Sequence, residues 1–237
     1  MRAKRRIALA GARDTLPLVI GTMPFAIIFG TLAVSAGLPP IAAIAMSAIV
    51  FAGSAQFISL SLIGGGAALP VIWLTTLVIN LRHALYSATL QPLARGWPLP
   101  WRTLTAFWLT DECFAVLERR LQTVGEADAL PYFVGSALFF YSNWICWTAV
   151  GALLGQQLPT LAAMGLDFAM LATFSAMIAP QLKAATPVCV AIAAGSTAWL
   201  AHGLPYKLGL VLAALVGVLV GALLDYRRRQ LVGETAS

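Results

Sequence analysis

The apolar positions of the chain form long runs that are separated by short polar breaks or by breaks rich in proline and glycine. Runs of more than about 18 apolar residues are typical of membrane-spanning helices. We predict about eight spans, of which the fourth is the least apolar. They are Leu16–Gly37, Pro40–Leu62, Ala68–Pro92, Trp101–Arg119, Pro131–Leu154, Thr160–Leu182, Ala185–Ala201 and Pro205–Tyr226. The pattern predicts an all-α, polytopic membrane bundle that forms a single transmembrane domain over residues 1–237.

The fourth segment leaves the number of crossings open. Asp111 and Glu112 lie in the middle of Trp101–Arg119, and such groups are tolerated at membrane depth only where protein or water surrounds them. The segment can cross as one helix, cross as a broken helix, or enter and return on the same side. In the last case the chain would have about six or seven crossings.

The composition excludes a soluble protein. Of the 237 residues, 60% are hydrophobic and 10% are charged, and the mean hydropathy is +0.86. Soluble domains carry about 25% charged residues. Strands of outer-membrane barrels alternate apolar and polar residues over about ten positions, and this pattern does not occur in the sequence.

The net charge of +6 comes mainly from basic residues beside the first and last spans. Such clusters stay on the cytoplasmic side. We therefore predict that the basic N-terminus (1–14) and the C-terminal tail (227–237) are cytoplasmic and that the partner is a lipid bilayer rather than a nucleic acid. About eight crossings meet this condition, but they leave Arg95 and Arg102 outside, against the rule.

A weak internal repeat divides the chain into two halves, 15–120 and 131–226. Phe29–Gly30, for example, is echoed by Val150–Gly151. Duplicated halves are common in transporters, in which discontinuous helices bind a solute near the membrane midplane. Units of four spans would give parallel repeats, and units of three would give inverted ones.

Arg82 is the first charged residue after a run, Thr15–Leu81, that contains none. Asn80, His83 and Tyr86 lie close to it. Polar groups at such a depth persist where they face protein or a cavity. The guanidinium suits a carboxylate, and His83 titrates near neutral pH, so these four residues are candidate substrate-binding residues. The alternative is that Arg82 reaches the interface and His83 caps a helix carbonyl.

Gly53, Ser54 and Gln56 form a second candidate site in the middle of the second span. One explanation for the small residues in this span is close packing of helices. The other is that the helix unwinds here and uses freed backbone groups and the Gln56 amide to bind a polar solute.

The acidic candidates are Asp111 and Asp167. Asp111 can pair with Arg82 or bind a substrate ammonium group. Asp167, near the start of the sixth span, can also bind an amine, or it can simply interact with the helix dipole.

The sequence shows no catalytic or cofactor chemistry. Cys113, Cys146 and Cys189 have no paired spacing, and there is no metal-ligand pattern, phosphate loop or nucleophile motif. We therefore predict no cofactor, no metal and no enzymatic activity.

Five segments occur in an order that resembles the AzlC family of branched-chain amino acid permeases, over Leu16 to Tyr226. They are Met46–Ser47, Phe51–Phe57, Asn80–His83, Thr110–Glu112 and Leu166–Phe168. The resemblance implies a multi-pass protein of the bacterial inner membrane that exports branched-chain amino acids, and sometimes methionine. It also implies a small hydrophobic partner subunit of the AzlD type.

The combined hypothesis is a secondary transporter for zwitterionic amino acids with aliphatic side chains. Arg82 and the backbone near Ser54 would bind the carboxylate, and Asp111 or Asp167 would bind the ammonium group. His83 would be the proton-sensitive group. The competing hypothesis is a non-transporting assembly subunit whose polar residues bind only a partner protein.

Overall fold

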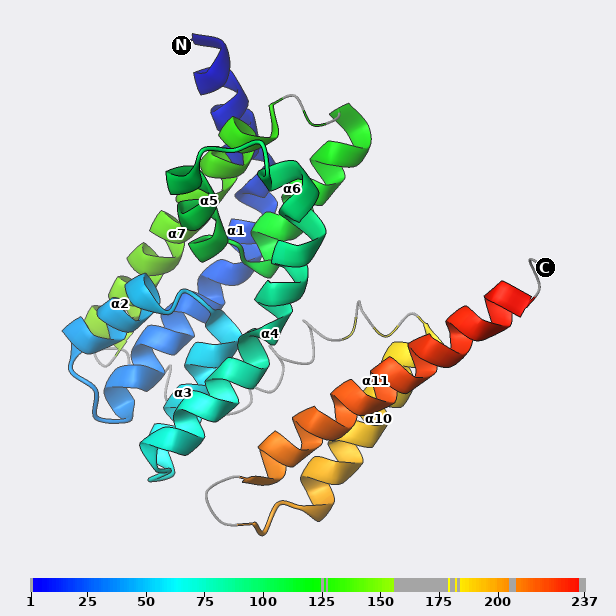
Figure 1. Cartoon of the computed structure of the whole chain (residues 1–237). Coiled ribbons are helices and arrows are strands. Elements are labelled where there is room, and N and C mark those ends of the chain that lie inside the picture. Colours follow the sequence, from blue (N-terminus) through cyan, green and yellow to red (C-terminus); the bar gives the residue numbers. More distant parts are fainter. Residues whose placement is uncertain are drawn as a thin grey trace. The chain divides into compact units, whose positions relative to one another are not determined.

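The computed structural model describes residues 2–124, 126, 128–155, 179, 182, 184–204 and 208–234. Within these ranges the regular elements are helices and no strand occurs, which confirms the predicted all-α bundle (Figure 1). The helices are α1 (Arg2–Ser35), α2 (Pro40–Ile49), α3 (Gly53–Gly64), α4 (Leu69–Ala94), α5 (Leu99–Phe107), α6 (Asp111–Val124), α7 (Ala129–Leu154), α10 (Ala185–Leu200) and α11 (Leu208–Glu234).

The chain divides into two compact units. The first comprises Met1–Leu60 and Asn80–Met164, and the second comprises Ser61–Ile79 and Gly165–Ser237. Within the second unit, α10 and α11 pack against each other. Every residue of the candidate site described below belongs to the first unit.

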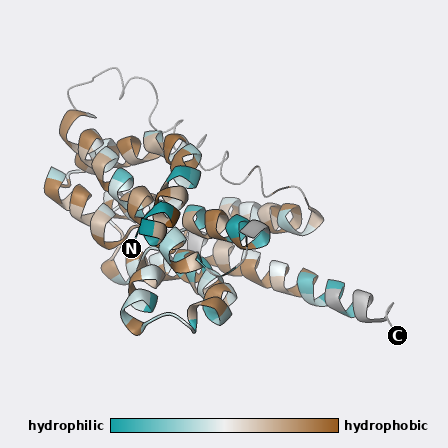
Figure 2. Ribbon diagram, turned by 90° about the horizontal axis from the view of Figure 1, so that it is seen from above, coloured by the Kyte–Doolittle hydropathy of each residue, from teal (hydrophilic) through white to brown (hydrophobic). Residues whose placement is uncertain are grey.

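Three helices, α1, α4 and α7, are long and apolar enough to cross a membrane, judged by length and composition among the described residues. Many large apolar side chains are exposed, including Ile20 and Leu85 at 61% and 69%. Figure 2 shows hydrophobic residues over most of the helices and hydrophilic ones near the N-terminus. Such surfaces are expected where a protein faces lipid.

Helices α1 and α7 lie side by side and run in the same direction. Thr15 Oγ1 forms a 2.6 Å hydrogen bond with Ser136 Oγ, and Thr31 Oγ1 donates to the Gly151 carbonyl at 3.2 Å. Residue numbers therefore rise together along the two helices. Gly30 faces the α7 backbone so closely that a side chain there would overlap it, as in the small-residue contacts of membrane helices.

The second predicted span is two helices that reverse direction. Gln56 Nε2 in α3 donates to Ser47 Oγ in α2 over 2.9 Å, although the two residues are nine positions apart. On one straight helix they would be separated by about 13 Å along the axis. The expected single crossing over Pro40–Leu62 is therefore corrected to a reversing pair, the α2/α3 pair.

The reversal takes place at Phe51, which has a φ of +43°. This left-handed backbone region is unfavourable for a bulky residue. The Phe51 ring is buried and packs edge-on against Tyr141, with ring centroids 4.8 Å apart, and also against Phe107 and Phe140. Aromatic packing therefore stabilises the strained turn.

Helices α5 and α6 form a second reversing pair, the α5/α6 pair. Phe107, at the end of α5, lies beside Tyr141, with ring centroids 5.9 Å apart. Arg120 in α6 lies over the ring of Tyr132. Tyr132 is about two and a half turns nearer to the start of α7 than Tyr141. The chain therefore reverses direction within Trp101–Arg119, which is the geometry that the re-entrant alternative requires.

The two pairs approach from opposite ends of α7. Ser47 Oγ bonds to Thr148 Oγ1 late in α7 at 2.8 Å, whereas Phe51, further along the chain, packs on Tyr141 in the middle of α7. The α2/α3 pair therefore enters from the end where α7 finishes, and the α5/α6 pair enters from the end where α7 begins. Both turns lie near the middle of α7.

The α1–α7 contact can be tested by adding one methyl group. Gly30→Ala would place a Cβ against the backbone carbonyl of Thr148, and we expect a loss of about 1–3 kcal/mol in stability because of overpacking. Gly21→Ala, on the same helix but facing open space, should leave stability unchanged or raise it by up to about 1 kcal/mol. Thermal unfolding of the purified protein in detergent measures both. An equal effect of the two substitutions would contradict the close packing.

Candidate functional site

Arg82, in the middle of α4, binds the first turn of α3 and the first turn of α6. Its Nη1 donates to Asp111 Oδ2 at 2.5 Å, and its Nη2 donates to Ser54 Oγ at 2.7 Å. The side chains of Arg82 and Asp111 are 26% and 30% exposed, so the ion pair is partly shielded. One guanidinium group therefore connects the turns of both reversing pairs.

The two helix N-termini at this site differ in charge. Helix α6 begins with Asp111 and Glu112, which interact favourably with the positive end of a helix dipole. Thr110 Oγ1 also accepts a hydrogen bond from the Cys113 amide at 3.4 Å. The first turn of α3 contains no acid, and first-turn amides have no intrahelical partner. The N-terminus of α3 is therefore the one that can attract an anion.

Several buried polar atoms of the site lack a hydrogen-bond partner. Five such side-chain atoms occur in the part of the chain that the structure describes, and four of them belong to predicted site residues. These four are Asn80 Oδ1, Arg82 Nε, His83 Nε2 and Asp111 Oδ1. An unsatisfied buried polar group costs about 1–3 kcal/mol, so a cluster of them indicates a site that can bind a polar group. Arg82 Nε offers a donor, and the oxygens of Asn80 and Asp111 offer acceptors.

Tyr86 links α4 to α6 beside this cluster. Its ring stacks on Phe114 with centroids 4.6 Å apart, and the His83 ring lies 6.3 Å from it. The site therefore has an aromatic side next to its charged groups. The structure brings Ser54, Arg82 and Asp111 into direct contact, as the sequence suggested for Arg82 and Asp111 alone.

Gln56 has a different environment from the other predicted residues. It is fully buried, and its amide nitrogen donates to Ser47 while its amide oxygen accepts from Trp144 Nε1 at 3.1 Å. Gly53 lies against the same indole ring, where a Cβ would come within 2.9 Å. These contacts attach the α2/α3 turn to α7, so Gln56 and Gly53 hold the site in position.

The sequence reasoning missed Ser47, Thr148 and Trp144 as residues that support the site. Ser47 belongs to the Met46–Ser47 segment of the family resemblance, and this could have indicated that it supports the site. Thr148 and Trp144 gave no comparable signal, because a threonine or tryptophan in an apolar helix is common. Asp167 lies outside the described residues.

The fold and the site define a polytopic helical membrane protein in which two reversing helix pairs meet at an ion pair. The AzlC protein family model matches residues 17–158. The chain is 30% identical over 194 residues to the inner membrane protein YgaZ of Escherichia coli, covering 78% of this chain and 77% of the relative. It is 32% identical over 209 residues to an uncharacterized membrane protein of Archaeoglobus fulgidus, covering 87% and 90%.

A third relative is the branched-chain amino acid transport protein AzlC of Bacillus subtilis, which is 27% identical over 168 residues, covering 70% of this chain and 65% of the relative. No solved structure matches the chain. The chain belongs to the AzlC family, and its broad role is membrane transport.

Gln56 is hydrogen-bonded at both ends of its amide and Asn80 Oδ1 has no partner, and this difference should be measurable as a difference in stability. Gln56→Leu leaves the Trp144 indole nitrogen without its buried partner and removes one of the two hydrogen bonds of Ser47 Oγ, and we expect a loss of about 2 kcal/mol or more. Asn80→Leu removes an oxygen that already has no partner, so its effect on stability should stay within about 1 kcal/mol. Thermal unfolding in detergent compares the two variants. A larger loss for Asn80→Leu would show that Asn80 has a structural role instead.

Proposed function

We propose that the chain is the transporting subunit of a secondary carrier that exports branched-chain amino acids, acting with a small hydrophobic AzlD-type subunit in the bacterial inner membrane. The family membership and the Bacillus subtilis relative support the substrate class. The proposal rests on one observation, which is the set of unpartnered donor and acceptor atoms around the Arg82–Asp111 ion pair.

The chemistry of this set matches a zwitterion. The substrate carboxylate accepts from Arg82 Nε and lies toward the N-terminus of α3 beside Ser54, where the helix dipole favours an anion. The ammonium group donates to Asp111 Oδ1 and Asn80 Oδ1. The aliphatic side chain packs against Tyr86, whose stacked partner is Phe114.

Substrate binding competes with the contacts of Arg82 with Asp111 and Ser54. The carboxylate at Arg82 Nε competes with Asp111 for the guanidinium, and the ammonium group at Asp111 Oδ1 competes with Arg82 for the carboxylate, so the ion pair between the two residues weakens. Arg82 holds one turn from each side of the unit, so this exchange loosens the two reversing pairs relative to α4. His83, adjacent to Arg82, is the proton-sensitive group that couples this exchange to pH.

The arrangement of basic residues supports a cytoplasmic N-terminus. Arg102 lines a cavity with Phe133, near the start of α7, and Arg120 lies over Tyr132. The start of α7 adjoins the start of α1, where the N-terminal basic residues lie. Arg95 and Arg102 thus join the other basic residues at one end, which follows the positive-inside rule. The conflict in the sequence-based topology came from counting the two reversing pairs as crossings.

The assignment of Arg82 and Asp111 is tested by amino acid flux. Arg82→Lys keeps the charge but loses the planar fork, and Asp111→Asn removes the ammonium partner. We expect Asp111→Asn to reduce leucine flux by about 30-fold or more, because breaking a partly shielded charge pair costs about 2 kcal/mol or more. We expect Arg82→Lys to reduce it by about tenfold or more, because the lost fork removes a charge-assisted hydrogen bond. The measurement is radiolabelled leucine transport in proteoliposomes containing the chain and its small partner subunit.

The matched control is Arg95→Gln, an exposed arginine outside the site, which should keep flux within about twofold. Wild-type flux in both Arg82→Lys and Asp111→Asn at equal incorporation would refute the substrate-binding role. Absence of leucine flux from the wild-type complex would instead favour the non-transporting assembly subunit.

The sidedness is tested by cysteine labelling. In a background with Cys146 and Cys189 replaced by alanine, Ala36→Cys and Gly96→Cys each add one exposed thiol. A membrane-impermeant maleimide should label Ala36→Cys in intact spheroplasts and Gly96→Cys only after permeabilisation. The topology of about eight crossings puts both positions outside, so labelling of Gly96→Cys in intact spheroplasts would overturn the present topology.

A further inference from the structure

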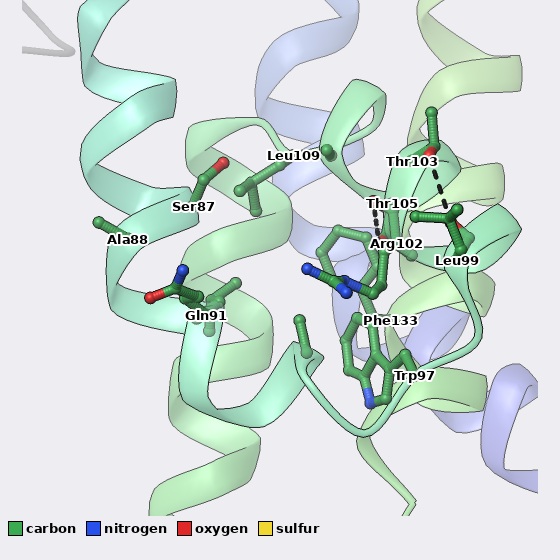
Figure 3. A pocket seen from close by; sticks show the side chains of 13 residues that line it. Ser87, Ala88, Gln91, Trp97, Leu99, Arg102, Thr103, Thr105, Leu109 and Phe133 are labelled. Carbon is green, nitrogen blue, oxygen red and sulfur yellow. Dashed lines mark hydrogen bonds between the residues drawn. The ribbon is translucent and has the colours of Figure 1, made fainter.

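A cavity of about 430 Å³ lies between α4 and α5, separate from the contacts of Arg82 (Figure 3). Ser87 and Gln91 line it from α4, and Arg102 lines it from α5 on the facing side. Trp97 and Phe133 add aromatic surface. The cavity therefore combines a cation, hydroxyl and amide groups, and an apolar wall.

The charge of the cavity is unbalanced. Arg102 is the single charged residue among the 13 that line it. Its side chain is exposed, and within the residues that the structure describes its guanidinium has no ionic or hydrogen-bonding partner. A free guanidinium fork is suited to a phosphate or carboxylate group. Because the cavity has no acid, it fits an anion better than a zwitterion.

The position of the cavity also indicates which anion binds there. It adjoins the end of α4, a helix long and apolar enough to cross a membrane. The residues that follow α4 include Arg95, Trp97, Trp101 and Arg102. Tryptophan and basic residues just beyond a span mark the membrane interface, and basic pockets between spans bind anionic headgroups.

We propose that this cavity binds the headgroup of an anionic phospholipid. The phosphate lies at the Arg102 guanidinium, and Gln91 and Ser87 bind the remaining polar groups of the headgroup. The acyl chains extend over exposed apolar residues of α5, which include Leu104 and Phe107. This binding does not depend on the transport proposal, because neither Arg82 nor Asp111 lines the cavity.

The test is retention of phosphatidylglycerol, measured by native mass spectrometry of the chain released from phosphatidylcholine nanodiscs that contain a series of phosphatidylglycerol fractions. Arg102→Gln should weaken retention more than about tenfold, because it removes the charge-assisted hydrogen bonds to the phosphate as well as a surface charge. Arg95→Gln removes an equal charge from the segment between α4 and α5 but not from the cavity, and it should weaken retention by no more than the roughly fivefold effect of one surface charge.

Two outcomes would overturn the proposal. Equal losses in Arg102→Gln and Arg95→Gln would show that lipid is attracted by net charge alone. Displacement of the lipid by millimolar inorganic phosphate or by leucine would show a site for small soluble anions or for substrate. Size-exclusion chromatography confirms that the variants remain folded, and leucine flux measured in parallel keeps this result distinct from the function of the Arg82 site.

Discussion

A guanidinium group held in the middle of a membrane helix is the constraint on which the first unit depends. An arginine at that depth costs about 2.5–3.5 kcal/mol on insertion scales unless nearby groups neutralise it. Asp111 neutralises the charge and Ser54 accepts a hydrogen bond from the guanidinium, and both residues lie in the first turn of a helix that starts inside the unit. Helices α2 and α5 have 10 and 9 residues, which makes each about 15 Å long, half of a bilayer core of about 30 Å. Their short length is what allows both turns to reach Arg82.

Helix α7 holds these turns in place. The Gln56 amide and the Trp144 indole attach the α2/α3 turn to α7, and Tyr141 donates to the Ala48 carbonyl at 2.7 Å. The Phe51 ring completes the attachment, and this packing offsets the cost of about 1–2 kcal/mol of a left-handed backbone at a bulky residue. Helix α7 is itself positioned by its close contact with α1. The polar site is thus supported by a rigid pair of spans.

The sequence predicted the class of the protein and the residues at its centre, but not the direction of every helix. Hydropathy records how apolar a segment is, and Pro40–Leu62 is long enough for one crossing or for two half-crossings. Gly53 was compatible with a break in the helix, but it did not indicate a reversal at Phe51, because the left-handed residue there is a phenylalanine held by its neighbours. On the proposed topology, the positions of Arg95 and Arg102 contained the missing information, because a topology made only of full crossings places both residues outside, against the positive-inside rule.

The pairing of Arg82 with Asp111 could be predicted because a buried cation needs an anion and few acids occur among the spans. The role of Gln56 could not, since an amide in a span is equally compatible with binding a solute and with joining helices. Only the structure separates these cases. Both hydrogen-bonding ends of Gln56 have partners, whereas atoms of Asn80, Arg82, His83 and Asp111 have none. Gln56 and Gly53 therefore support the site through their contacts with α2 and α7.

Under the proposed function, the opposite charges of Arg82 and Asp111 also restrict which solutes the site can bind. Opening a partly shielded ion pair leaves two opposite charges to be satisfied, and the cost of an uncompensated charge there is at most the roughly 3–5 kcal/mol of a fully buried one. A simple anion would pair with Arg82 and leave Asp111 without an ionic partner. A simple cation would pair with Asp111 and leave Arg82 without one. A zwitterion satisfies both at once and leaves the net charge of the site unchanged. Preference for amino acids over their deaminated or decarboxylated analogues would then follow from charge balance at Arg82 and Asp111, before any contact with the aliphatic side chain is considered.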